Sequence, residues 1–109
     1  MKQLRHLVSI LAVGGLLAAS FSTFAASTSA ELVANALIHD DRPSEDAVDD
    51  ARRMPLEVLA FAGIEAGMSI FELEGGGGYY TEILSRAVGP AGSVIVQNPP
   101  SFDAFLGDG

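Results

Sequence analysis

The sequence predicts an α/β fold that contains one parallel strand–helix–strand unit. Met68–Leu73 and Ser93–Val96 are short apolar runs of the kind that forms buried parallel strands. Between them, Tyr79–Val88 carries apolar residues at helical spacing, and four consecutive glycines, Gly75–Gly78, precede it. Because strand, turn, helix and strand follow one another through short connections, we expect a right-handed βαβ unit.

The first 25 residues have the three parts of a secretory signal peptide. Lys2 and Arg5 form a basic start, and Leu7–Phe21 is apolar and uncharged, with small residues following it. An apolar run of 15 residues, rich in Ala and Gly, is short for a membrane span. We therefore expect cleavage after Ala25, export to a bacterial periplasm, and no stable membrane anchor afterwards.

Residues 26–66 predict an acidic helical segment ahead of the βαβ unit. Glu31–Ile38 stacks apolar residues at helical spacing, and Pro43 suits the first turn of a second helix that runs to Arg53. Pro55–Ala62 is expected to form a third helix, with Gly63 at its end. The acids between Asp40 and Asp50 lack the spacing of a calcium loop, so we interpret them as a solvated face.

The four glycines are best explained by a close approach of a ligand to the backbone. Glycine reaches positive φ without a Cβ clash and leaves main-chain N–H groups open at the start of the following helix. A run of glycines also occurs in flexible linkers, but linkers are flanked by polar residues. Here two strand-like apolar runs and a helix flank the glycines, which favours a nucleotide-type turn.

An acid at the end of the first strand, followed by a Gly-x-Gly turn, resembles the first motif of class I S-adenosylmethionine-dependent methyltransferases. Glu72 takes the acid position, Gly76 and Gly78 take the second and third glycine positions, and Glu74 stands where the first glycine is usual. Together with residues 53–68 and Gln97-Asn98-Pro99, this pattern resembles a group of exported bacterial predicted methyltransferases, in which the first glycine is often replaced.

The resemblance implies a cofactor, a fold and a set of contacts. Glu72 would lie near the cationic methionine end of S-adenosylmethionine, the glycines would admit it, and Gln97 or Asn98 would hold its ribose. One of the tyrosines at 79 and 80 is expected in the core and the other at the cofactor. The predicted cofactor-binding residues are Glu72, Glu74, Gly76, Gly77, Gly78, Tyr79, Gln97 and Asn98.

Residues 67–109 would then form a partial Rossmann-like methyltransferase domain, the first part of a doubly wound sheet. They hold two strands and one helix, and residues 99–109 continue with no third strand and with two phenylalanines that have nothing to pack on. We accordingly expect an N-terminal fragment of a longer protein or a truncated gene product, inactive in transfer by itself. The sequence identifies neither the catalytic residues nor the methyl acceptor.

Charge and cysteine content limit the partners. The net charge is −8, and it becomes −10 without residues 1–25, which carry two of the six basic residues and no acid. A chain without a basic patch is not expected to bind nucleic acid. No cysteine is present to form a disulfide or bind a metal as thiolate, and we predict no metal site.

Two other functions remain open. An exported, non-catalytic binding protein could keep the same glycine turn. A NAD-dependent oxidoreductase is disfavoured, because its fingerprint needs a different glycine spacing and an acid about twenty residues after the turn, where neutral Gln97 lies.

Overall fold

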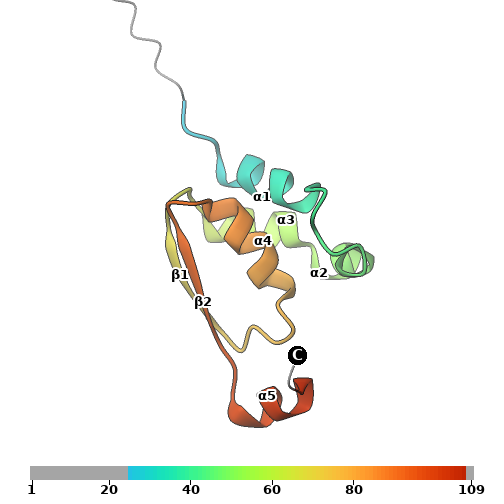
Figure 1. Cartoon of the computed structure of the whole chain (residues 1–109). Helices are drawn as coiled ribbons and strands as arrows, with labels where there is room; N and C mark the ends of the chain where they lie inside the picture. Colours follow the sequence, from blue (N-terminus) through green and yellow to red (C-terminus); the bar gives the residue numbers. More distant parts are fainter. Residues whose placement is uncertain (1–24, 108–109) are drawn as a thin grey trace, which may run out of the picture.

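The structure, a computed structural model, describes residues 25–107. The predicted signal peptide falls almost entirely on residues 1–24, which lie outside this range. The described elements, in chain order, are α1 (Ser29–Leu37), the 3-10 helix η1 (Asp46–Asp49), α2 (Asp50–Arg53), α3 (Pro55–Ala62), β1 (Ser69–Leu73), α4 (Tyr79–Val88), β2 (Ser93–Gln97) and α5 (Pro100–Leu106). Helices α1, α3 and α4 lie on one side of the two strands (Figure 1).

The two strands form a parallel pair, which confirms the predicted α/β class and the strand–helix–strand order. The register runs from Ser69 opposite Ser93 to Leu73 opposite Gln97. Because the strands are parallel, their carboxyl ends meet at one edge of the sheet, next to the glycine turn. Helix α4 connects the strands and has the bounds that its apolar spacing predicts.

The core lies where α4 meets α1 and α3. Ile83 and Val88 of α4 are fully buried with Val33 of α1, and Leu59 of α3 joins the same cluster. The partly buried Ile70 of β1 packs against it from the sheet. The predicted helical segment 26–66 and the βαβ unit therefore contribute to one continuous interior.

The N-terminal helices agree with the sequence analysis in two of three cases. Helix α1 begins two residues early, because Thr28 and Glu31 form a capping box. Helix α3 has the predicted bounds, and Gly63 ends it at φ +72°. The helix predicted from Pro43 to Arg53 is wrong for its first part: the backbone N–H of Asp46 donates to the Pro43 carbonyl three residues before, so turns and a 3-10 helix form there. Only Asp50–Arg53, α2, is α-helical, and it ends at the predicted residue.

The segment after β2 differs from the expectation of a tail without packing partners. Residues 100–106 form α5, which lies beyond the carboxyl edge of the sheet (Figure 1). The Phe102 ring is half-buried near Gly76, whereas Phe105 is exposed. A helix at this place puts an aromatic ring beside the glycine turn, which the apolar content of the tail alone did not indicate.

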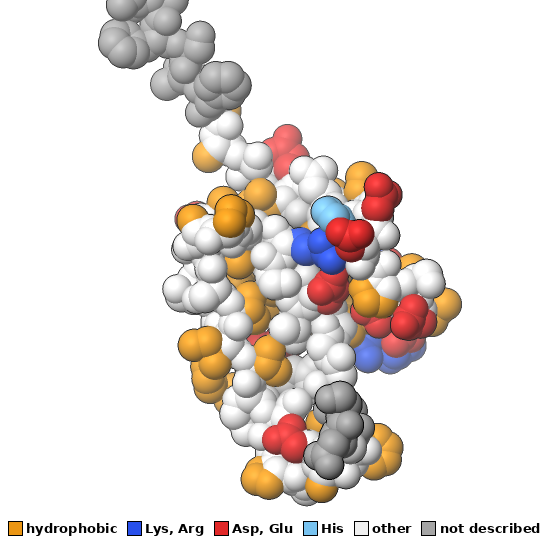
Figure 2. All heavy atoms as spheres, viewed as in Figure 1, with side chains coloured by type: hydrophobic (Ala, Val, Ile, Leu, Met, Phe, Trp, Pro, Cys, Tyr) orange, Lys and Arg blue, Asp and Glu red, His pale blue; other side chains and the backbone are white. Residues whose placement is uncertain are grey.

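The outer face of the sheet is exposed, which corrects the prediction of buried strands. Phe71, Leu73 and Ile95 are 61%, 71% and 60% exposed. Hydrophobic side chains gather along the side of the molecule where the strands run, whereas acidic ones gather on the opposite side (Figure 2). The physical reason is that the helices packed on the strands all lie on their other face. Within residues 25–107 no helix is long and apolar enough to cross a membrane.

Candidate functional site

The glycine loop, residues 74–78, joins β1 to α4 at the carboxyl edge of the sheet. The backbone N–H of Gly75 donates to the Gln97 carbonyl at 3.4 Å, and that of Gly78 donates to the Gly75 carbonyl at 3.2 Å. Asn98 holds the loop twice: its Oδ1 accepts from the Gly76 N–H at 2.9 Å, and its Nδ2 donates to the Gly76 carbonyl at 3.1 Å. The loop therefore has a defined shape, fixed from the end of β2.

The glycines of the loop are not equivalent. A Cβ at Gly75 would lie 2.6 Å from Cγ1 of Val96, whereas a Cβ at Gly77 would meet nothing within 4 Å. Gly76 has φ +64°, and Glu74 has φ +53°, so the acid occupies a conformation that glycine adopts without strain. The steric demand at Gly75 comes from β2 across the sheet, so it cannot be predicted from the spacing of the glycines along the chain.

Glu72 lies on the inner side of the loop and ties β1 to α4. Its Oε2 accepts a hydrogen bond from the Thr81 hydroxyl at 2.6 Å, and the side chain is half-buried. Its carboxyl carbon would be 3.0 Å from a Cβ at Gly75. The carboxylate of Glu72 therefore borders the loop.

Several hollows border the glycine loop. One of about 430 Å3 opens between the loop, the segment 45–53 and α5. Its floor is residues 75–77, and its charged and aromatic lining comes from Glu45, Asp46, Asp49, Arg53, Glu74, Tyr79 and Phe102. A smaller hollow of about 210 Å3 lies between Gly76, Asn98 and Phe102. Four carboxylates against one guanidinium make the larger hollow favourable for a cation.

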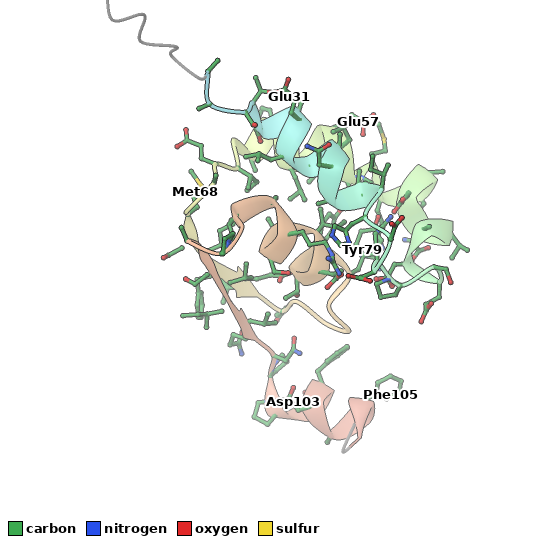
Figure 3. All side chains as sticks on the ribbon, turned by 45° about the horizontal axis from the view of Figure 1, so that its top comes forward. Glu31, Glu57, Met68, Tyr79, Asp103 and Phe105 are labelled. Carbon is green, nitrogen blue, oxygen red and sulfur yellow. The ribbon has the colours of Figure 1, made fainter. Side chains whose placement is uncertain are left out.

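A third hollow, also of about 430 Å3, lies on the other side of Tyr79 and is more apolar. Val58, Leu73 and Leu84 line it, together with Glu72 and both tyrosines. Tyr79 borders this hollow and the acidic one, and it lies where α4 faces the N-terminal helices (Figure 3). Tyr79 is nonetheless buried, so the tyrosine counted as a cofactor contact also belongs to the core.

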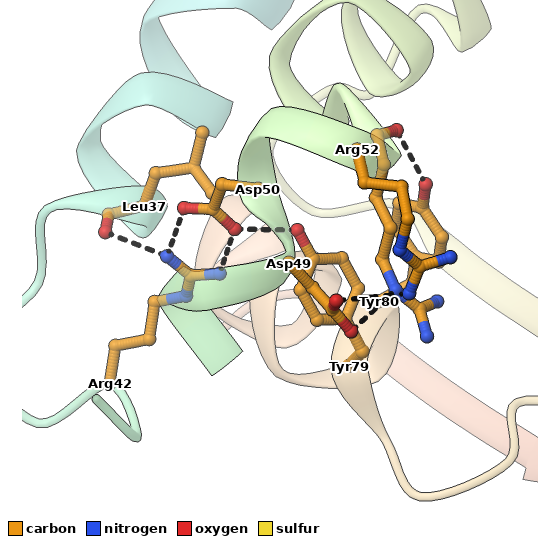
Figure 4. A network of polar contacts seen from close by, with 8 residues as sticks. Leu37, Arg42, Asp49, Asp50, Arg52, Tyr79 and Tyr80 are labelled. Atoms are coloured by element: carbon orange, nitrogen blue, oxygen red, sulfur yellow. Dashed lines mark hydrogen bonds and ion pairs between the residues drawn. The ribbon is translucent and has the colours of Figure 1, made fainter. Parts of the chain in front are cut away.

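A polar network anchors Tyr79 to the N-terminal segment (Figure 4). The buried Arg42 donates to both carboxylate oxygens of Asp50, at 2.8 and 2.6 Å. The Tyr79 hydroxyl donates to Asp50 Oδ1 at 2.6 Å. The hydrogen bond from Arg42 lowers the pKa of Asp50, and burial together with the bond to Asp50 raises the pKa of Tyr79 to about 12. Tyr79 is thus a neutral donor to an ionised carboxylate.

A second set of contacts lies beside this network. The Arg53 guanidinium sits 4.4 Å from the centre of the Tyr79 ring and donates to Asp49 at 3.3 Å. The Tyr80 hydroxyl donates to the Arg53 backbone carbonyl at 3.0 Å. Arg52 also donates to Asp49, at 3.0 Å, so both neighbouring arginines pair with this acid. Arg53, which lines the acidic hollow together with Asp49, therefore lies against the first two residues of α4.

The structure brings most predicted site residues to one edge of the sheet. Six of them line hollows beside the loop: Glu72, Glu74, Gly76, Gly77, Tyr79 and Asn98. Gly78 precedes α4, and Gln97 contributes its carbonyl to the loop. The interpretation of the acids as a solvated face is wrong for Asp50, which pairs with a buried arginine. Within the described range, no group of three or more His, Asp or Glu side chains could hold a metal ion.

Sequence reasoning missed Gly75, Arg42, Asp50 and Phe102 as members of this region. The four-glycine run contained a signal for Gly75, but nothing local distinguished it from its neighbours. A search of family models, curated proteins and solved structures for relatives of this chain found no match.

Proposed function

We propose that this chain binds S-adenosylmethionine at the glycine loop, as the first βαβ unit of a Rossmann-like methyltransferase fold exported to the periplasm. One observation carries the proposal: a shaped glycine loop lies at the carboxyl edge of a parallel strand pair, with Glu72 on one side and an acidic hollow on the other. Ligands of open α/β sheets bind at this edge.

The charges around the loop support this cofactor over a dinucleotide. The acidic hollow presents Glu45, Asp46 and Glu74, while Arg53 is already paired with Asp49. A pyrophosphate would be repelled by these carboxylates, whereas the ammonium and sulfonium groups of S-adenosylmethionine would be attracted. The oxidoreductase alternative therefore has an electrostatic argument against it as well as the glycine spacing.

The residues around the loop fit part of the cofactor. The roles that we propose for them differ from those that the resemblance implies at Asn98. Glu72 and Glu74 would hold the cationic end, and residues 75–77 would let the ligand lie against the backbone. Because Asn98 already uses both amide atoms on Gly76, it would act by holding the loop, which leaves the ribose to Gln97. The bound cofactor would supply an electrophilic methyl group, and these residues would orient it.

Calorimetry on the full chain tests the proposal. We expect S-adenosylhomocysteine and S-adenosylmethionine to bind and NAD to give no heat. Glu72→Gln keeps the shape and the bond to Thr81 but removes the charge, so it should weaken binding of both by about tenfold, the usual effect of a charged hydrogen-bond partner. Glu57→Gln, on the exposed part of α3, is the matched control and should change nothing.

The other outcomes separate the alternatives. Binding of NAD in place of S-adenosylhomocysteine would indicate the oxidoreductase. Heat from none of the three ligands would contradict the proposal and leave an exported binding protein with a different ligand as the better interpretation.

A further inference from the structure

We propose that Asp50 is a positioning residue for the glycine loop: it acts through the Tyr79 hydroxyl to fix the first turn of α4 and with it residues 75–78. The contacts that carry this inference are independent of any ligand. Its meaning for cofactor binding rests on the proposed function.

The start of α4 needs an external anchor. Its N-cap is Gly78, at φ +95°, and within residues 25–107 no side chain caps this helix. A glycine N-cap provides no side-chain acceptor for the first-turn N–H groups. The orientation of the first turn therefore depends on tertiary contacts to charged groups: Thr81 donates to Glu72 of β1, and Tyr79, the residue next to the loop, donates to Asp50 of the N-terminal segment.

Asp50 is itself held in place. Arg42 donates hydrogen bonds to both carboxylate oxygens of Asp50. It also donates to the carbonyl of Leu37, at the end of α1, at 3.3 Å. The Arg42 side chain is only 4% exposed. A bidentate arginine fixes the plane of a carboxylate, so Asp50 offers Tyr79 an acceptor in one direction. The line of contacts therefore runs from α1 through Arg42, Asp50 and Tyr79 to the loop (Figure 4).

Comparison with Tyr80 shows what is specific to the contact between Tyr79 and Asp50. Tyr80 also donates a hydroxyl hydrogen bond to the N-terminal segment, but its acceptor is the neutral Arg53 carbonyl. Hydrogen bonds to an ionised partner are about twice as strong as neutral ones. Tyr79 also follows Gly78 directly, whereas Tyr80 lies one residue further along the helix. We therefore expect loss of the Tyr79 hydroxyl to loosen the loop more than loss of the Tyr80 hydroxyl.

Amide hydrogen exchange in the full chain tests this inference without a ligand. The amides of Gly75, Gly76 and Gly78 are hydrogen-bonded in the loop, and that of Ile83 reports on the core of α4. Tyr79→Phe should speed exchange at the three glycines by about tenfold relative to Ile83. Tyr80→Phe, which removes the same atom one residue away, should change this ratio less than threefold.

A second pair of variants tests the role of the carboxylate. Asp50→Asn should also loosen the loop, with some acceleration at Ile83 because the variant removes the charged partner of the buried Arg42. Asp50→Glu, which keeps the charge, should restore part of the protection. Glu57→Gln, which removes the charge of an exposed carboxylate on α3, is the control. In Tyr79→Phe, which leaves the Arg42–Asp50 pair intact, equal acceleration at the glycines and at Ile83, or an unchanged loop, would overturn the inference.

Titration of the same variants with S-adenosylhomocysteine separates this inference from the proposed function. If the unmodified chain binds, Tyr79→Phe should weaken binding by about tenfold, and by more than Tyr80→Phe, whose ring also lines the apolar hollow beside the loop. If the unmodified chain does not bind but the exchange pattern appears, Asp50 positions the loop and the methyltransferase proposal fails. If binding occurs and the loop exchange is unaffected by Tyr79→Phe, the positioning role fails and the methyltransferase proposal stands.

Discussion

One face of the β1–β2 sheet packs on α4, whereas the other presents Phe71, Leu73 and Ile95 to solvent. On the packed side, Ile83 and Val33 are fully buried. The hydrophobic stabilisation of the described residues therefore comes from one side of the sheet. The glycine loop lies at the boundary, held by β2 on one side and by the N-terminal helices through Tyr79 on the other.

The largest expected effect separates the two faces directly. Ile83→Ala removes three buried carbons from the α4 core and should lower the free energy of unfolding by about 2–5 kcal/mol. Ile95→Thr, on the exposed face, should change it by less than about 0.5 kcal/mol. Urea denaturation followed by circular dichroism measures both. Similar losses in the two variants would show that the faces are not different in the way the structure describes.

The glycine loop gives the next largest contrast. Gly75→Ala places a Cβ against Val96 and should cost about 1–3 kcal/mol of unfolding free energy, as overpacking does in cores. Gly77→Ala points into open space and should cost less than about 0.5 kcal/mol. The same denaturation assay compares them, and a larger loss at Gly77 would contradict the described loop geometry.

The Tyr79–Asp50 contact predicts a pH dependence at both extremes. The pKa of Tyr79 is raised to about 12, so its contribution to stability is complete below the unfolded value near 10 and is lost between about pH 10 and 12. The pKa of Asp50 is lowered, so its contribution is present above about pH 4 and is lost as the pH falls through the folded value.

Melting temperatures across pH check this dependence. Tyr79→Phe should remove part of the alkaline decline, and Asp50→Asn should remove part of the acid decline. Tyr80→Phe serves as the control at high pH. A decline of unchanged size between pH 10 and 12 in Tyr79→Phe would mean that the phenol does not form the contact described.

The smallest effect concerns the acid that replaces the first glycine of the motif. Glu74→Gly relieves the left-handed conformation at φ +53° and should raise the free energy of unfolding by about 0.5–1 kcal/mol. The same replacement in a helix, Glu57→Gly on α3, should lower it by about 0.5–1 kcal/mol. If both variants lose stability equally, Glu74 is not strained.

Local pattern was enough to predict the elements with strong periodicity. The bounds of α3 and α4 follow from Pro55 and from apolar spacing, and both strands follow from short apolar runs. The sequence does not predict the conformation of residues 43–49, because Pro43 is equally compatible with a helix start and with a turn. In the structure, the backbone hydrogen bonds at the start of this segment join residues three apart, as in turns and 3-10 helices. Helix α5 was missed because seven residues carry too little periodicity.

The candidate site also has a part that the sequence predicts and a part that it does not. Glu72 and the glycine run are contiguous, so the sequence alone predicts a loop that the structure then shapes. The Asp50–Tyr79 contact spans 29 residues and the clash at Gly75 involves Val96, so both depend on how distant segments pack. Spacing along the chain contains no information on either contact.

The most direct test of the account is a titration of the 15N-labelled full chain with S-adenosylhomocysteine, followed by amide chemical shifts. We expect saturable shifts at residues 74–79 and at Gln97 and Asn98, with none at Phe71 or Ile95 on the exposed face. Shifts that remain absent at millimolar ligand, or that concentrate on the exposed face of the sheet, would contradict the claim that the glycine loop is a cofactor site.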